Sequence, residues 1–233
     1  MNEINNLKSG YSLFYEKSDL NKTFPNEYLI RIFLGNYPRL KLDRNFKNKN
    51  ILDLGMGDGR NLKFFCSLGF DGYGVEITKS IIDKVDNEFS YTQYKPKLKV
   101  GNSKKIPFED NFFDYLVSWN SSYYMGYEDN FNLIESHFHE ISRVIKKGGY
   151  LVISVPQSTD SVFNYSEEIK PGYRKITKDY YEIRTDFIMA SFEDQKYLEN
   201  LLSPFFYNFA HGDVTDDCFG LNKHSFLIVC KKK

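Results

Sequence analysis

Three glycines alternate with other residues directly after a short apolar run, and this spacing favours a ligand-binding turn. The segment Ile51–Arg60 reads Ile-Leu-Asp-Leu-Gly-Met-Gly-Asp-Gly-Arg. Gly55 and Gly57 permit a tight turn and the close approach of a ligand to the backbone, and Gly59 is expected to let the next helix pack against the strand. Asp53 lies two residues before the turn, where its carboxylate would repel a pyrophosphate but attract an ammonium group. The turn therefore predicts a site for a small ligand with a positive charge.

More polar residues follow the next three apolar runs, where strands are expected to end. Glu76 ends the second run, and an acidic side chain at this place can accept hydrogen bonds from both hydroxyls of a ribose. Asn102 and Ser103 follow the third run, and Trp119-Asn120 closes the fourth. Ligands of open α/β sheets bind beyond the carboxyl ends of the strands, so these residues are predicted to line one site.

The elements that position these residues alternate regularly from residue 50 onward, which indicates a parallel α/β sheet with helices on both faces. Strands are predicted at 50–54, 72–77, 97–101, 112–119, 149–155, 205–211 and 224–230. Helices are predicted at 26–34, 59–68, 78–89 and 128–146. A last helix is expected from Ser191, which forms a capping-box pattern with Asp194. Residues 156–190 are long for a connection, and their tyrosines and arginines favour a lid over a passive linker.

The pattern resembles the class I S-adenosylmethionine-dependent methyltransferases, of the bacterial kind that acts on small molecules. Four blocks carry this resemblance, in the family's order and at its separations: 51–60, 74–76, 100–118 and 139–153. It implies a Rossmann-like fold with seven strands, mostly parallel, and an antiparallel last strand. It also implies S-adenosyl-L-methionine as the cofactor and S-adenosyl-L-homocysteine as its product. On this basis the chain is a single domain with an N-terminal helical cap (1–48), a cofactor-binding core (49–155), an acceptor lid (156–190) and a closing helix and strands (191–233).

The resemblance also assigns residues to the cofactor. Those beside its methionine part and the transferred methyl are Asp53, Gly55, Met56, Gly57, Trp119 and Asn120. Those beside its ribose and adenine are Glu76, Ile77, Asn102 and Ser103. Asn102 departs from the acidic residue usual at its position, but an amide oxygen can still accept the adenine amino group.

Candidate acceptor and catalytic residues come from the segments expected at the same sheet edge. Tyr123, Tyr124 and Tyr127 follow the fourth strand, where Tyr123 and Tyr124 could position a hydroxyl or sugar acceptor near the methyl. His211 is expected to end the sixth strand, with Asp213 to orient it as a general base. His137 and His139 are expected to turn away from the site. The lid residues predicted to bind the acceptor, with the arginines clamping a phosphate or carboxylate, are Arg174, Tyr180, Tyr181 and Arg184.

Composition excludes several classes of function. The 31 basic and 31 acidic residues cancel, which argues against binding nucleic acid through bulk charge. No apolar run approaches the ~18 residues of a membrane span, and the N-terminus lacks an export signal. The three cysteines lack metal spacing, so no metal is expected. We expect a cytoplasmic monomer or homodimer whose partner is a small molecule.

Three alternatives stay open at this point. An NAD-dependent oxidoreductase is disfavoured because Arg60 stands where its third fingerprint glycine would fall. A methyltransferase-like protein that binds the cofactor without catalysis, as a partner or regulatory subunit, is compatible with the same motifs. Methylation of nucleic acid is disfavoured because Asn120-Ser-Ser-Tyr123 has no prolines. The expected function is methyl transfer to an oxygen or nitrogen of a small molecule, such as a sugar, nucleotide-linked or phosphorylated precursor of a surface polysaccharide.

Overall fold

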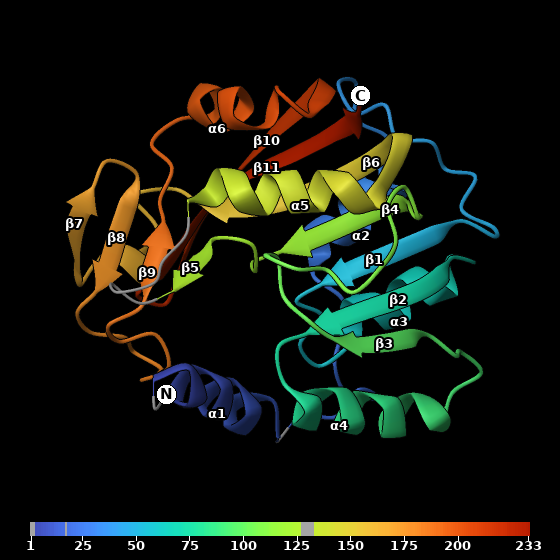
Figure 1. Ribbon diagram of the computed structural model, residues 1–233, viewed down its shortest axis with the longest axis horizontal. Coiled ribbons are helices and arrows are strands. Elements are labelled where there is room, and N and C mark those ends of the chain that lie inside the picture. Colours follow the sequence, from blue (N-terminus) through green and yellow to red (C-terminus); the bar gives the residue numbers. More distant parts are fainter. Residues whose placement is uncertain (1–2, 17, 127–132) are drawn as a thin grey trace.

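The main sheet has seven strands, as the sequence predicts (Figure 1). The structure is a computed structural model that describes residues 3–16, 18–126 and 133–233. The strand order is β10-β11-β6-β4-β1-β2-β3, and β11 alone runs in the direction opposite to the other six strands. The strands are β1 (Asn50–Leu54), β2 (Asp71–Glu76), β3 (Lys97–Val100), β4 (Phe113–Trp119), β6 (Ile145–Pro156), β10 (Phe206–Cys218) and β11 (Leu221–Lys232). This is the Rossmann-like fold of the class I methyltransferases.

Helices cover both faces of this sheet because neighbouring residues on each strand point in opposite directions. Leu52 of β1 packs in one buried cluster with α5 (Ile134–Val144) and α6 (Gln195–Leu202). Ile51, the preceding residue, packs in another cluster with α2 (Glu27–Leu34) and α3 (Arg60–Ser67). Strand β1 is therefore packed against helices on both faces of the sheet.

The third glycine of the turn, Gly59, packs against a helix and not against a strand. Gly59 precedes α3 with φ of 78°, a left-handed conformation that suits glycine. A Cβ added there would lie 2.8 Å from Val85 of α4 (Lys79–Ser90). The expected reason for Gly59, packing of the helix on the strand, was wrong: the glycine makes room for α4.

Residues 156–190 form strands, so the expectation of a long irregular loop was wrong. A second, antiparallel sheet has the order β5-β9-β8-β7 and lies beside the main sheet (Figure 1). Its strands are β5 (Tyr124–Gly126), β7 (Ser166–Lys170), β8 (Tyr173–Ile176) and β9 (Ile188–Ala190), and a short 3₁₀ helix, η1 (Ser161–Phe163), precedes β7. Tyr173, Ile176 and Ile188 are buried in the same core as α5, which explains why the segment folds.

Several boundaries also differ from the predictions. The last helix begins at Gln195 instead of Ser191, because the Asp194 side chain accepts a hydrogen bond from the Tyr197 N–H and caps it. Of the predicted helix 128–146, the structure shows α5, from Ile134 to Val144, and residues 127–132 lie outside the described residues. Strands β10 and β11 form a hairpin that extends past the end of β6, because β11 pairs with β6 only as far as Ser225.

The N-terminal cap contains a helix that the sequence analysis missed, α1 (Glu3–Glu16). It lies between α4 and the second sheet (Figure 1). The Ser12 hydroxyl is 2.9 Å from that of Ser80 in α4, and Gly10 lies against Ile183 in the connection before β9. No described side chain of α1 is fully buried, and short helices are marginal alone, so these edge contacts hold it in place. No helix in the described parts of the chain is long and apolar enough to cross a membrane.

Candidate active site

A cavity of about 720 Å³ lies beyond the carboxyl ends of β1, β2, β3 and β4. Its walls come from the glycine turn, α1, the second sheet and the β10–β11 hairpin. This volume is within the range of small-molecule sites. Of the residues assigned to the cofactor, those that line it are Gly55, Glu76, Ile77, Asn102, Ser103, Trp119 and Asn120. Seven of the ten residues assigned to the cofactor therefore come together at one cavity, and their role in binding stays a prediction.

Glu76 is held at the end of β2 by two backbone groups. Its Oε2 accepts a hydrogen bond from the Gly57 N–H at 3.0 Å, and its Oε1 accepts one from the Ile77 N–H at 2.6 Å. Burial raises the pKa of Glu76, and these two N–H groups oppose that rise. A carboxylate has about four acceptor positions, so Glu76 can still accept hydrogen bonds from two ligand hydroxyls.

Asp53 lies beneath the glycine turn and does not line the cavity. Its side chain is 1% exposed, and its Oδ2 has no hydrogen-bond partner. Burial raises the pKa of Asp53 to about 8, and the nearby carboxylates of Glu76 and Asp58 add to the rise. A positive charge brought to the turn would favour its ionised form, because opposite charges stabilise each other in a buried site. Asp53 is therefore suited to act on a ligand through its charge rather than by lining the cavity.

Two other residues of the turn do not contact the cavity as expected. The Met56 side chain is buried with Leu62 and α4, and its sulfur lies near Gly74, so it belongs to the core. Gly57 has φ of 55°, and a Cβ there would lie 2.7 Å from the ring of Tyr15. The space beside Gly57 is thus occupied by a tyrosine of α1, where the sequence analysis had expected a ligand.

Asn102 cannot accept an adenine amino group in the expected way. Its Oδ1 accepts hydrogen bonds from the backbone N–H of Lys104 at 2.9 Å and of Lys105 at 3.1 Å. This local turn uses the oxygen that the expectation required, and it is a common arrangement for asparagine. Asn102 still lines the cavity, and its amide nitrogen is the group left for a ligand.

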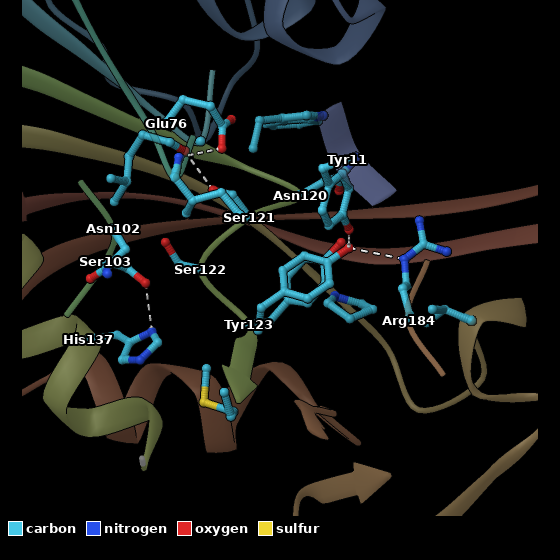
Figure 2. A pocket seen from close by; sticks show the side chains of 18 of the residues that line it. Tyr11, Glu76, Asn102, Ser103, Asn120, Ser121, Ser122, Tyr123, His137 and Arg184 are labelled. Carbon is cyan, nitrogen blue, oxygen red and sulfur yellow. Dashed lines mark hydrogen bonds between the residues drawn. The ribbon is translucent and has the colours of Figure 1, made fainter. Parts of the chain in front are cut away.

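His137 lies at the cavity, although the sequence predicted that it would turn away. Its Nδ1 is 2.9 Å from the Ser103 hydroxyl, and the residue is 1% exposed (Figure 2). Burial lowers the pKa of His137 to about 4, and the charge of Lys104 contributes. Its Nε2 is buried and has no hydrogen-bond partner, so the neutral ring forms part of the cavity wall.

Asn120 has a strained backbone at the end of β4. Its φ is 53°, a conformation that asparagine tolerates better than most residues. Ser154 of β6 fixes it from both sides: the Asn120 N–H donates to the Ser154 hydroxyl at 2.9 Å, and that hydroxyl donates to Asn120 Oδ1 at 3.0 Å. The amide oxygen is therefore turned toward Ser154, and the amide nitrogen stays available as a donor. Strain of this kind is concentrated at functional sites.

The opposite end of the cavity is formed by tyrosines and one arginine. The Tyr11 hydroxyl donates to the Tyr124 hydroxyl at 2.6 Å, and Arg184 Nε donates to the same oxygen at 3.1 Å (Figure 2). Tyr123 stacks on Tyr124, with ring centroids 4.8 Å apart. Arg184 Nη1 lies 2.9 Å from a buried oxygen of Asp179. Tyr123, Tyr124 and Arg184 thus line the cavity as predicted, but the charge of Arg184 is already paired.

Other predicted acceptor residues lie elsewhere. Arg174 bonds to Ser166 and faces Glu168 on the second sheet, outside the cavity lining. Tyr180 is 78% exposed and Tyr181 is also exposed, and neither lines the cavity. Both lie in the connection before β9, which turns them toward solvent. Tyr127 lies outside the described residues.

His211 does not lie at the active edge, so its expected position was wrong. The hairpin continues past it to Cys218, which places His211 within β10, opposite Ile228. Its Nε2 is 2.7 Å from a carboxylate oxygen of Glu199 in α6, and it does not line the cavity. Asp213, the expected partner of His211, bonds to Gln157 and Gln195 instead.

Sequence reasoning missed the residues that α1 contributes. Tyr11, Phe14 and Tyr15 all line the cavity. They are spaced by three and four residues, and this spacing places them on one face of a helix, so it was a usable signal. Ser121 and Ser122 also line the cavity beside Asn120, and no sequence pattern marked them.

Comparison with known proteins agrees with this geometry. Residues 52–153 match the family model of the methyltransferase domain. The matched segment contains the glycine turn, Glu76, Asn102 and Asn120, and it ends within β6. No curated protein was found to be similar in sequence.

Solved structures share the fold over most of the chain. A SAM-dependent methyltransferase from Methanosarcina mazei is 21% identical with a TM-score of 0.64, over 84% of this chain and 98% of that one. The PH0226 protein from Pyrococcus horikoshii is 20% identical with a TM-score of 0.62, over 89% and 87%. The 1,6-didemethyltoxoflavin-N1-methyltransferase from Burkholderia thailandensis, solved with its substrate and S-adenosylhomocysteine, is 14% identical with a TM-score of 0.57, over 80% and 72%. These similarities establish the fold.

Proposed function

We propose that this protein is an S-adenosylmethionine-dependent methyltransferase that acts on an oxygen or nitrogen of a small molecule. The observation that carries the proposal is one shared cavity, which has the glycine turn, Glu76 and Asn102 at one end and the tyrosines with Arg184 at the other. A donor and an acceptor bound in one cavity can be aligned for direct transfer, and alignment is the main task of a methyltransferase.

The residues at the first end fit the donor. Glu76 has acceptor positions left for the ribose hydroxyls, and the unpartnered oxygen of Asp53 lies where a cationic amino group would offset its burial. The donor supplies an electrophilic methyl group on a sulfonium. This chain holds the donor with Glu76 and the glycine turn, and it excludes water with Tyr11 and Tyr15 of α1, which line the cavity.

The second end supports a small acceptor without a phosphate clamp. Arg174 does not line the cavity, and Arg184 is paired with Asp179. The expectation of a phosphorylated or nucleotide-linked sugar of a surface polysaccharide therefore loses its main support. A small acceptor is compatible with the neighbour of the same fold that was solved with 1,6-didemethyltoxoflavin and S-adenosylhomocysteine bound.

Ligand binding separates this proposal from its rivals. Calorimetry with S-adenosylhomocysteine and, separately, with NAD should show binding of the first alone. Binding raises thermal stability by mass action, so a melting shift gives a second measurement. A shift with NAD alone would support an oxidoreductase and refute the proposal.

Catalysis needs its own experiment. Donor labelled in the methyl group should be incubated with pools of small hydroxyl and amine compounds, and mass spectrometry should find a labelled product. Tight binding of S-adenosylhomocysteine without transfer to any pool would favour a cofactor-binding partner or regulatory protein.

A further inference from the structure

The tyrosine cluster at the acceptor end, which consists of Tyr11, Tyr123 and Tyr124, has hydroxyls that can donate into the cavity. The Tyr11 hydrogen is donated to Tyr124. The Tyr124 oxygen also accepts from Arg184 Nε, so the Tyr124 hydrogen has to be donated elsewhere. Tyr123 and Tyr124 both line the cavity, and their O–H groups are therefore placed to donate to an acceptor molecule.

The surroundings keep this cluster a donor. Burial raises the pKa of Tyr11 and of Tyr123, and the neighbouring Tyr124 adds to both rises, so these hydroxyls keep their hydrogens. Burial alone would lower the pKa of Arg184. The interactions with Tyr124, Tyr11 and Asp179 raise this pKa by more than burial lowers it, so the guanidinium stays charged. The Tyr124 oxygen accepts hydrogen bonds from both Tyr11 and Arg184, and accepting these bonds makes its own O–H a stronger donor to an anion.

Asn120 supplies a second donor to the same cavity. Its Oδ1 accepts the hydrogen of Ser154, which leaves its Nδ2 as the free end of the amide. Ser154 is itself 1% exposed, so this orientation is enforced by a buried partner. The acceptor molecule is thus offered hydrogen-bond donors by both Asn120 and the tyrosine cluster.

The histidines do not supply a general base to this cavity. His137 is the one of the four that lines it, and its Nδ1 is bonded to Ser103 while its Nε2 is buried. His211 is bonded to Glu199, and His224 lies between Thr159 and Asp217. His139 is exposed on α5.

The described carboxylates of the cavity are also poor bases for an acceptor near Tyr124. Glu76 is bonded to two backbone N–H groups at the donor end. Asp160 accepts from the N–H of Val162 and of His224, and it lies 3.7 Å from Lys223. Asp216 lies in the part of the hairpin that extends beyond β6. Among the described residues, the side chains bonded to one another at the acceptor end, Tyr11, Tyr124 and Arg184, are therefore hydrogen-bond donors.

We propose that the acceptor is an acidic hydroxyl compound of the phenol or enol class, bound as its oxyanion by the tyrosine cluster and Asn120. This inference rests on the proposed function, and it names the substrate class of the same cavity. The acceptor loses its proton to water before it binds. A lone pair of the oxyanion then forms the C–O bond to the methyl group while the C–S bond breaks, and that electron pair stays on sulfur. The products are a methyl ether and a thioether, and no protein group has to take a proton during the step.

A coloured probe tests the proposal without an identified substrate. The protein loaded with S-adenosylhomocysteine is titrated into 4-nitrophenol at the pH where half of the free probe is ionised. We expect the phenolate absorbance to rise, because the site binds the anion more tightly than the phenol. The methyl ether 4-nitroanisole, which cannot ionise, should bind at least about tenfold more weakly, as expected when a hydrogen bond to a charged group is lost.

Variants identify the residues responsible. Tyr124→Phe should abolish the absorbance rise and weaken phenolate binding at least about tenfold. Tyr123→Phe should weaken it too, while Tyr91→Phe, at an exposed position outside the cavity, is the matched control and should change nothing. Calorimetry with S-adenosylhomocysteine and a melting curve on every variant show that the fold and the donor site are intact.

Each outcome decides the question. The proposal is overturned if the probe binds as the neutral phenol, if Tyr124→Phe binds phenolate as well as the parent does, or if the loaded protein binds neither 4-nitrophenol nor unsubstituted phenol. Failure of S-adenosylhomocysteine to bind would instead refute the proposed function.

Discussion

Replacement of Asp53 by Asn should stabilise the protein and weaken binding of the donor at the same time. The carboxyl of Asp53 is buried beneath the glycine turn with an unpartnered oxygen, and its pKa is about 8 in the folded protein against an ordinary value of 3.8. An amide has a similar shape and carries no charge. The variant therefore removes a charge that the fold accommodates poorly.

The size of the effect follows from the two pKa values. The folded state retains the Asp53 proton up to about pH 8, while the unfolded chain loses it near pH 4, so the stability of the parent falls as the pH rises between these values. Each pKa unit corresponds to about 1.4 kcal/mol, which gives a cost of about 4 kcal/mol at pH 7. Asp53→Asn should be more stable than the parent by a few kcal/mol at pH 8, and the two should converge near pH 4.

Denaturant unfolding at pH 4.5 and at pH 8 measures this difference, with Asp86→Asn, an exposed position in α4, as the control. The same variant should bind S-adenosylhomocysteine more weakly by about 1.5–3 kcal/mol, because it lacks the negative charge that favours the ligand's ammonium group. In the parent, binding should release a proton near pH 7, which calorimetry in buffers of different ionisation enthalpy detects. A variant that is less stable than the parent at pH 8, or that binds the ligand equally well, would refute the account of Asp53.

Three further changes test other parts of the site. Glu76→Ala should weaken S-adenosylhomocysteine by about 1.5–3 kcal/mol in calorimetry, and a loss of a few tenths would show that Glu76 does not bind the ribose. Asn102→Asp should strengthen the same ligand, since one carboxylate oxygen can keep the turn with Lys104 while the other accepts the adenine amino group; unchanged or weaker binding would contradict this. The pKa of His137 falls from 6.5 to about 4 on folding, so stability should decline as the pH drops from 6.5 to 4, by up to about 3 kcal/mol, and His137→Leu should lack that decline in unfolding measured across this range.

The main sheet could be predicted from the sequence because its signals are local. Apolar runs such as 50–54 and 113–119 are buried on both faces, and such runs mark parallel strands without reference to the rest of the chain. The glycine turn and Glu76 are also local, since a strand end fixes the position of the residue that follows it. Their place at the cavity was therefore foreseeable from spacing alone.

The second sheet could not be predicted in the same way. Strand β9 has three residues and pairs with β8 on one side and with β5 on the other. Strand β5 lies more than 60 residues before β9 in the chain. Pairing of such short strands depends on the partner rather than on intrinsic preference, so the segment resembles a loop when it is viewed alone. The same reason explains His211: the hairpin continues past the end of β6, and this moves the histidine from a strand end to a strand interior.

The acceptor end is the part of the site least visible in the sequence, because four separate segments build it. Tyr11 comes from α1, Tyr124 from β5, and Arg184 from the connection before β9, while Asn120 is oriented by Ser154 of β6. The folded structure is needed to see that the Tyr124 oxygen accepts hydrogen bonds from both Tyr11 and Arg184. It also shows that Asp179 pairs with the charge of Arg184, which in the sequence seemed available to a phosphate. The same arginine that suggested an anionic clamp in the sequence serves in the structure to orient a hydroxyl. The proposed acceptor class thus rests on the direction of hydrogen bonds, which no residue pattern records.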